Sequence, residues 1–282
     1  MEKREFKDGI KLSIIGFGGV LVMNEDQETA NKRVSYAIEK GINYFDVAPT
    51  YGDAEIKLGP ALRGKRKEIF LACKTGERTK DSAWKQLHES LKNLETDYFD
   101  LYQLHAMTTM EDFEKVIGPN GALSAFVKAK EEGLIRYIGF SAHSVEVALK
   151  LLDVFNFDSI LFPINFVEFF NTNFGPQVIE KAKEKNVKIL AIKALAKTIV
   201  PEGQERPYKK AWYVPIEDYK IAELALRFTL SQPITSAIPP GEYKFWEWAL
   251  NIAENFKPIT KEEVNYLKEV AKGIEPIFKL AV

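Results

Sequence analysis

Four polar residues stand at or just past the ends of short apolar runs, and their side chains could together carry out acid–base chemistry. Asp46, Lys74 and His105 each follow a run typical of a β-strand, and Tyr51 comes shortly after Asp46. A phenol can donate a proton, and a neighbouring ammonium can change the pKa of that phenol. A carboxylate can keep the ammonium charged, and an imidazole can hydrogen-bond a reacting oxygen. The four side chains therefore predict a site of proton transfer.

These residues need a scaffold that brings strand ends together, and the order of elements along the chain indicates one. Strand-like runs alternate with helical patterns, which favours βαβ units around a parallel sheet. Eight strands are predicted: Ser13–Phe17, Ile42–Phe45, Ile69–Cys73, Phe99–Leu104, Ile135–Phe140, Ser159–Pro163, Lys188–Ile192 and Ser236–Ile238. Eight parallel strands predict a (β/α)8 barrel, in which strand ends meet on one face. An open doubly wound sheet is the alternative, and the absence of a G-x-G-x-x-G after the first run weakens it.

The composition narrows the classes of function. The 282 residues are 46% apolar and contain no linker-like stretch, so we expect a single domain over residues 1–282. A formal net charge of −1 argues against nucleic acid or a membrane as partner. No segment resembles a membrane span. The one cysteine, Cys73, lies in an apolar run, so we expect it to be a small buried hydrophobic residue in a cytoplasmic protein. We also expect a monomer. No residues stand at metal-ligand spacing, so no metal site is predicted.

Several segments, taken in order, resemble one family. The stretches Asp46–Gly52, Cys73–Thr75 and Asp97–His105 are similar to those of the aldo-keto reductases, and the resemblance extends to Arg136–Ser141 and Ile238–Pro239. It implies a (β/α)8 barrel and reversible hydride transfer between a nicotinamide cofactor and a small-molecule carbonyl substrate. It also implies an N-terminal hairpin that closes the bottom of the barrel, here residues 4–6 and 11–13.

The predicted reaction gives each of the four polar residues a role. Hydride addition to a carbonyl creates alkoxide character that a proton donor must neutralise, and Tyr51 is the predicted general acid. An ammonium about 4 Å from a phenolate contributes roughly 4 kcal/mol at an effective dielectric of ~20, enough to lower the phenol's pKa by about 2–3 units. Lys74 is predicted to be that cation, Asp46 to keep it protonated, and His105 to orient the carbonyl. Singly, each residue could be structural; the joint spacing favours catalysis.

The segments predicted to bind the cofactor resemble the family less closely than the four polar residues do. The residues predicted to bind the cofactor are Ser141, Asn165, Lys193, Ala194, Leu195, Gly241 and Glu242. Ala142 stands where the family usually has an asparagine, and Ile192 where it commonly has an aromatic residue that stacks on the nicotinamide. Lys193 could face a cofactor phosphate or solvent. NADP is the family-based expectation, and Glu242 leaves NAD possible.

The sequence constrains the substrate, and the alternatives to the predicted function, less tightly than it does the fold. Seven apolar residues are candidates for the barrel mouth and would suit a hydrophobic aldehyde or ketone in an open pocket: Phe17, Met23, Trp84, Met107, Phe169, Phe170 and Trp212. One alternative function is a non-catalytic nicotinamide-binding barrel that serves in regulation or interaction. Another is a barrel isomerase or hydrolase that acts through Asp46 and His105.

Overall fold

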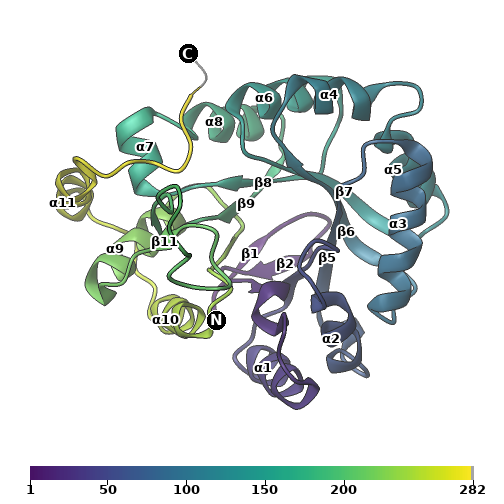
Figure 1. Ribbon diagram of the computed structural model, residues 1–282, viewed down its shortest axis with the longest axis horizontal. Coiled ribbons are helices and arrows are strands. Elements are labelled where there is room, and N and C mark those ends of the chain that lie inside the picture. The colour runs from purple at the N-terminus through teal and green to yellow at the C-terminus, as the bar shows by residue number, and fades with distance from the viewer. Residues whose placement is uncertain (281–282) are drawn as a thin grey trace.

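The computed structural model describes residues 1–280 and places eight parallel strands in one sheet, in the order β12-β9-β8-β7-β6-β5-β4-β3 (Figure 1). The strands are β3 (Phe17–Gly18), β4 (Tyr44–Asp46), β5 (Phe70–Thr75), β6 (Phe99–Met107), β7 (Ile135–Ala142), β8 (Ser159–Pro163), β9 (Lys188–Ile192) and β12 (Ser236–Ile238). A parallel bridge between Ile15 and Ala237 joins the two ends of the sheet, and the Gly16 amide donates to the Ala237 carbonyl. The sheet is therefore closed, which confirms the predicted (β/α)8 barrel and excludes the open sheet.

Helices surround the barrel (Figure 1). Their bounds within residues 1–280 are α1 (Gln27–Glu39), α2 (Ala54–Ala61), α3 (Lys80–Asn93), α4 (Met110–Ile117), α5 (Ala122–Glu131), α6 (Val145–Val154), α7 (Phe166–Thr172), α8 (Pro176–Glu184), α9 (Tyr219–Leu230), α10 (Tyr243–Glu254) and α11 (Lys261–Ala271), with short 3-10 turns η1 (Gly19–Val22) and η2 (Arg66–Glu68). In α3, Ala83, Leu87 and Leu91 are buried at the spacing of one helix face. None of these helices is long and apolar enough to cross a membrane.

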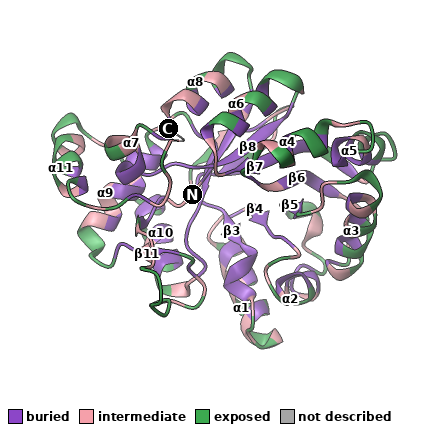
Figure 2. Cartoon of the chain, turned by 45° about the horizontal axis from the view of Figure 1, so that its top comes forward, coloured by how far each residue is buried: buried purple, intermediate pink, exposed green. Residues whose placement is uncertain are grey.

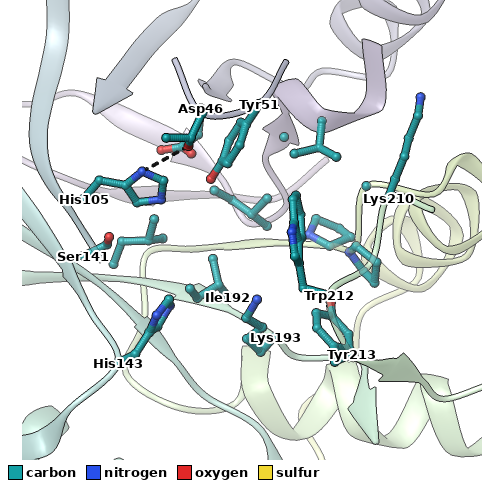
Figure 3. Close-up of a pocket in the computed structure, with 18 of the residues that line it drawn as sticks. Asp46, Tyr51, His105, Ser141, His143, Ile192, Lys193, Lys210, Trp212 and Tyr213 are labelled. Atoms are coloured by element: carbon teal, nitrogen blue, oxygen red, sulfur yellow. Dashed lines mark hydrogen bonds between the residues drawn. The ribbon is translucent and has the colours of Figure 1, made fainter. Parts of the chain in front are cut away.

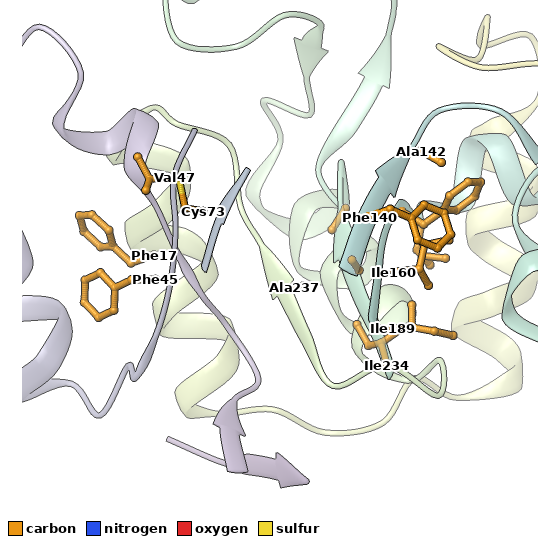
Figure 4. Packing of buried hydrophobic residues seen from close by; sticks show 14 of the residues in the cluster. Phe17, Phe45, Val47, Cys73, Phe140, Ala142, Ile160, Ile189, Ile234 and Ala237 are labelled. Atoms are coloured by element: carbon orange, nitrogen blue, oxygen red, sulfur yellow. The ribbon is translucent and has the colours of Figure 1, made fainter. Parts of the chain in front are cut away.

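The strands bury side chains on both faces, so two layers of core form (Figure 2). Inside the barrel, Phe70 and Ala72 of β5 pack with side chains from the other strands and from the N-terminal segment. Cys73, between Ala72 and Lys74, belongs to the outer layer between sheet and helices, where Phe17 and Phe45 also lie (Figure 4). Because side chains alternate along a strand, Lys74 points into the barrel as Ala72 does.

The ends of several strands differ from the prediction. β5, β6 and β7 continue past their apolar runs to Thr75, Met107 and Ala142, so Lys74 and His105 lie within strands rather than beyond them. Parallel pairing uses backbone groups and continues where the side chains become polar, provided that those side chains find partners. The first predicted strand, Ser13–Phe17, is wrong in extent, since β3 covers only Phe17–Gly18 and Ile15 forms an isolated bridge.

A bulge interrupts β6 beside His105. Leu104 pairs with Phe140 and Met107 with Ala142, so two residues of β6 oppose one residue of β7. The backbone of Ala106 takes a positive φ of 52° at this point. A bulge of this kind redirects a side chain at the rim of a barrel. The alternation from Gln103 already directs His105 inward, and the bulge changes the direction of the strand directly after it.

The bottom of the barrel is closed by an antiparallel hairpin of β1 (Lys3–Glu5) and β2 (Lys11–Ser13), which confirms the predicted hairpin with its first strand shifted by one residue. Phe6 is fully buried and packs edge-on against Phe70 and Tyr137, at centroid distances of 5.0 and 5.3 Å. The Tyr137 hydroxyl donates to Asp8 in the hairpin turn, at 2.7 Å. The hairpin therefore seals one end of the barrel and leaves the other end for chemistry.

Candidate active site

The structure brings the four predicted polar residues together at the carboxyl ends of β4, β5 and β6. Figure 3 shows three of them, Asp46, Tyr51 and His105. Lys74 is fully buried and forms an ion pair with Asp46. Its Nζ lies 3.4 Å from Tyr51 Oη and donates a hydrogen bond to it. Tyr51 sits in the turn after β4, where its amide donates to the Ala48 carbonyl. A phenol thus touches a buried ammonium, which in turn contacts a buried carboxylate.

Two residues that the sequence reasoning missed hold Asp46 in place. Gln103 Nε2 donates to Asp46 Oδ2 at 3.0 Å, and the Tyr44 hydroxyl donates to the same oxygen at 3.2 Å. Each lies two positions before a predicted site residue on the same strand, since Tyr44 precedes Asp46 and Gln103 precedes His105. The period of two along a strand puts such residues on the same face. That periodicity was the signal that could have found them.

The pKa of Tyr51 differs from the expectation. Burial of the phenol raises the pKa of Tyr51 above its ordinary value of 10, and the nearby Lys74 charge opposes this rise without reversing it. The predicted net lowering is wrong, because desolvation penalises the phenolate more than one ammonium, itself paired with Asp46, stabilises it. Burial by itself would lower the pKa of Lys74, but the charges of Asp46 and Tyr51 raise it above its ordinary value. At neutral pH, Tyr51 is a protonated phenol beside a charged lysine.

His105 is a neutral imidazole in this setting. Burial, reinforced by the charge of Lys74, lowers the pKa of His105 to about 3. Its ring stands edge-on to Tyr51 at a centroid distance of 5.8 Å, and Nδ1 lies 3.4 Å from Thr50 Oγ1. A neutral imidazole carries one N–H donor, so His105 can hydrogen-bond a carbonyl oxygen without adding charge.

A cavity of about 490 Å³ opens above these residues (Figure 3). Asp46, Tyr51, Lys74 and His105 all line it. Of the predicted cofactor residues, three also line it: Ser141, Lys193 and Gly241. Trp212, from the loop between β10 (Ala196–Thr198) and β11 (Val214–Pro215), covers one side, with its ring 6.1 Å from that of Tyr51. Proton donor and cofactor-side residues therefore share one space.

The other four predicted cofactor residues do not line the cavity. Asn165 caps α7, and its Oδ1 accepts the amides of Val167 and Glu168 at 2.9 and 3.1 Å. Ala194 and Leu195 are fully buried in the core. Glu242 accepts the Lys210 amide at 2.8 Å and so fastens the loop after β9. Asn165 Nδ2 is buried and has no hydrogen-bond partner within residues 1–280, whereas the other three side chains pack in the core or hold the loop. A role of these four residues in cofactor binding stays a prediction.

The apolar walls also differ from the prediction. Of the seven candidates for the barrel mouth only Trp212 lines the cavity, and Phe17 and Met107 are fully buried in the core. Ile277 and Phe278 of the C-terminal segment form a wall instead, so the predicted openness of the pocket is wrong on that side. The Phe278 ring stacks on His143 at 5.0 Å. No periodic pattern marks these residues, because they lie outside any regular element.

The family model of the aldo/keto reductases matches residues 14–272. The chain belongs to the aldo-keto reductase family. It is 27% identical to the uncharacterized oxidoreductase YqkF of Bacillus subtilis, over 96% of this chain and 97% of that protein. It is 30% identical to aldo-keto reductase yakc [NADP(+)] of Schizosaccharomyces pombe, over 90% of this chain and 82% of that protein. Among solved structures, the holo form of aldo-keto reductase AKR11C1 from Bacillus halodurans superimposes with a TM-score of 0.74, at 25% identity and 98% coverage of both chains.

The residues of this aldo-keto reductase fit a nicotinamide cofactor. The cavity floor is apolar where Leu161 and Ile192 line it, and the Ser141 hydroxyl beside it accepts the Ala106 amide at 2.7 Å. An apolar surface next to a polar group suits a flat ring with an amide substituent. At Gly241 a Cβ would lie 2.3 Å from Val20 Cγ1, so only glycine lets the backbone pass this close to the cavity wall.

Glu168 ties the C-terminal wall to the barrel and gives a pH-dependent prediction. It is 1% exposed, its Oε1 accepts the Ile277 amide at 3.1 Å, and burial raises its pKa from 4.5 to about 8. A folded-state pKa above the unfolded value means that stability is lost as the pH rises toward 8. We expect Glu168→Gln to raise the free energy of unfolding at pH 7.5 by roughly 1–3 kcal/mol and to change it little at pH 5.

Chemical denaturation of both proteins at the two pH values measures this difference. Lys193 and Tyr213 are the titratable groups whose charges act on Glu168 or respond to it. Burial lowers the pKa of Lys193 to about 8, so it stays mostly charged at both pH values, and burial raises the pKa of Tyr213, so it stays neutral. An equal effect of Glu168→Gln at both pH values would contradict the buried-acid explanation.

Proposed function

We propose that this protein is an NADPH-dependent reductase of aldehydes and ketones, in which Tyr51 is the general acid. The observation that carries the proposal is the 3.4 Å contact of Tyr51 Oη with the buried Lys74, at a cavity that also holds the neutral His105. A bound nicotinamide supplies the hydride for the carbonyl carbon. The protein residues must then position the carbonyl oxygen and deliver a proton to it.

The protonation state of each of these side chains determines its role in the proposed reaction. The N–H of neutral His105 hydrogen-bonds the carbonyl oxygen and turns it toward Tyr51. The Tyr51 phenol donates its proton to that oxygen as negative charge develops there. Lys74 stabilises the phenolate that remains, and Asp46 keeps Lys74 charged and oriented. Trp212 and Phe278 border the same cavity and limit the access of water.

The raised pKa of Tyr51 predicts opposite pH profiles for the two directions of the reaction. Reduction needs the protonated phenol, which persists until the pH rises through a pKa above 10. Oxidation needs the phenolate, whose fraction grows about tenfold per pH unit below that pKa. We therefore expect kcat for reduction to stay level from pH 6 to 9 as far as Tyr51 is concerned, and kcat for alcohol oxidation to climb. Steady-state rates in both directions measure the two profiles, and a fall in reduction near pH 7 would contradict the assignment.

Three exposed cations support NADPH over NADH. Arg206 and Lys209 lie in the loop between β10 and β11, Lys244 lies in the first turn of α10, and none of them forms an ion pair within residues 1–280. Glu242, which would repel a 2′-phosphate, is held by the Lys210 amide. The similar protein of Schizosaccharomyces pombe carries NADP(+) in its name. A cytoplasmic location and a monomeric state remain predictions.

The test follows the absorbance of the reduced cofactor while the protein acts on a panel of aldehydes and ketones, with NADPH and NADH in parallel. Turnover with a lower KM for NADPH supports the proposal. Tight binding of NADPH with no turnover of any carbonyl would instead favour the non-catalytic nicotinamide-binding barrel. Equal KM values for the two cofactors would contradict the preference for the phosphate.

A further inference from the structure

Lys193 is a cation in the cavity that the proposed chemistry does not use. Three lysines line the cavity, and two of them are paired: Lys74 with Asp46, and Lys210 with Glu25 at 2.6 Å. Lys193 Nζ makes no hydrogen bond and no ion pair within residues 1–280. The rings of Tyr213 and Trp212 lie 4.8 and 6.0 Å from Lys193 Nζ (Figure 3).

The position of Lys193 is fixed by the backbone as well as by these rings. Its φ is +66°, a left-handed conformation that lysine rarely adopts. Residues held in this conformation cluster at ligand sites, where the surrounding fold compensates for the strain. The Ala196 amide donates to the Lys193 carbonyl at 2.8 Å and so closes the turn that presents the side chain.

The surroundings of Lys193 suit an anionic oxygen. Burial lowers its pKa to about 8, so the ammonium stays mainly charged at pH 7 but has lost much of its hydration. The nearest counter-charge is Glu168, whose own pKa of about 8 leaves it mostly protonated at that pH. A partly desolvated cation without a partner gains more from an incoming anion than a solvated one does.

We propose that Lys193 binds the carboxylate of an oxo-acid substrate, so that the preferred carbonyl compounds carry a negative charge. This inference rests on the proposed carbonyl reduction and adds a substrate class to it. The charge of Lys193 acts on His105 and His143, which places it toward the wall that orients the carbonyl. A cofactor phosphate offers the same anionic oxygens, and Lys209 and Lys244, which are exposed and have no ion-pair partner within residues 1–280, are the cations proposed above for it.

The experiment compares 4-oxobutanoate with its neutral methyl ester at saturating cofactor, in the wild type and in Lys193→Met. Methionine keeps the length of the side chain and has no β-branch that the left-handed backbone would exclude. We expect the ratio of kcat/KM for acid over ester to fall by about 10–100-fold, the effect of one charged hydrogen bond. Lys193→Arg should keep the ratio within about threefold, and Lys210→Met, which removes the paired cation, should leave it unchanged.

Two further measurements distinguish failure of the carboxylate site from failure of the proposed carbonyl reduction. If the cofactor dissociation constant rises about tenfold in Lys193→Met while the ratio stays constant, Lys193 binds a phosphate of the cofactor and the proposal is overturned. Calorimetric titration with succinate does not depend on turnover. If the wild type reduces neither compound but binds succinate about tenfold more tightly than Lys193→Met does, the carbonyl reduction fails and the carboxylate site stands. Equal succinate affinities would overturn the site.

Discussion

Replacing Tyr51 with phenylalanine is expected to lower kcat for carbonyl reduction by about 10²–10⁴-fold, the usual range for loss of a general acid. Phenylalanine keeps the ring that stands edge-on to His105 and near Trp212 but lacks the hydroxyl that contacts Lys74. The carbonyl oxygen would then acquire negative charge with only the hydrogen bond from the His105 N–H to stabilise it, because the phenol proton is missing. Single-turnover mixing of the variant, cofactor and aldehyde measures the chemical step directly.

Two controls show whether the loss of activity in Tyr51→Phe comes from the missing proton donor. The cofactor dissociation constant of Tyr51→Phe should stay within about twofold of the wild type, because the phenol contributes only part of the cavity wall. Thr50→Val is a matched variant, since Thr50 Oγ1 lies 3.4 Å from His105 Nδ1 but does not touch Lys74. It should reduce kcat far less than Tyr51→Phe. Full activity of Tyr51→Phe would mean that another group donates the proton.

The barrel and the convergence of the polar side chains at one end of it could be predicted because both depend on local patterns. The alternation of strands and helices is periodic, and a strand that ends in a polar residue delivers it to a common face. Asp46, Lys74 and His105 meet for this reason. The apolar run around Cys73 also predicted that this residue is buried, and it lies in the outer layer of the core.

The cofactor side could not be predicted in the same way, because it is built by contacts between distant segments. Glu242 is used by the Lys210 amide, and Asn165 by the first turn of α7. Phe278 reaches the cavity by stacking on His143, a pairing that no local pattern encodes. The net pKa of Tyr51 depends on burial and on the Asp46 charge together, and a pairwise estimate with Lys74 alone gave the wrong sign.

Replacing Asp46 with asparagine is expected to lower the free energy of unfolding by about 3–5 kcal/mol at pH 7, because it leaves Lys74 as an uncompensated buried cation. Lys74 is fully buried, and Asp46 is its only ion-pair partner within residues 1–280. Tyr44 and Gln103, which donate to the carboxylate, would lose a charged acceptor as well. We also expect kcat to fall by about 10²-fold, since Lys74 would no longer be held charged beside Tyr51.

The free energy of unfolding of Asp46→Asn should depend on pH in a definite direction. In the wild type the pKa of Lys74 is raised, so its contribution to stability is present at neutral pH and is lost only as the pH rises through that value. Without Asp46, burial lowers the pKa of Lys74 below that of the unfolded chain. The variant then gains stability as the pH rises, and its deficit should narrow between pH 7 and 10. Urea titrations across this range measure it, and a constant deficit would contradict the buried-cation explanation.

A double variant separates the structural from the catalytic contribution of this pair. Asp46→Asn combined with Lys74→Met removes both charges, and replacing a buried ion pair by uncharged groups is often close to neutral for stability. We therefore expect the double variant to recover most of the stability lost in Asp46→Asn. Its kcat should remain at least as low as that of the single variant, because no cation then stabilises the Tyr51 phenolate. Recovery of activity together with stability would show that the pair serves the fold alone, whereas recovery of stability without activity would show that its charge acts in the reaction.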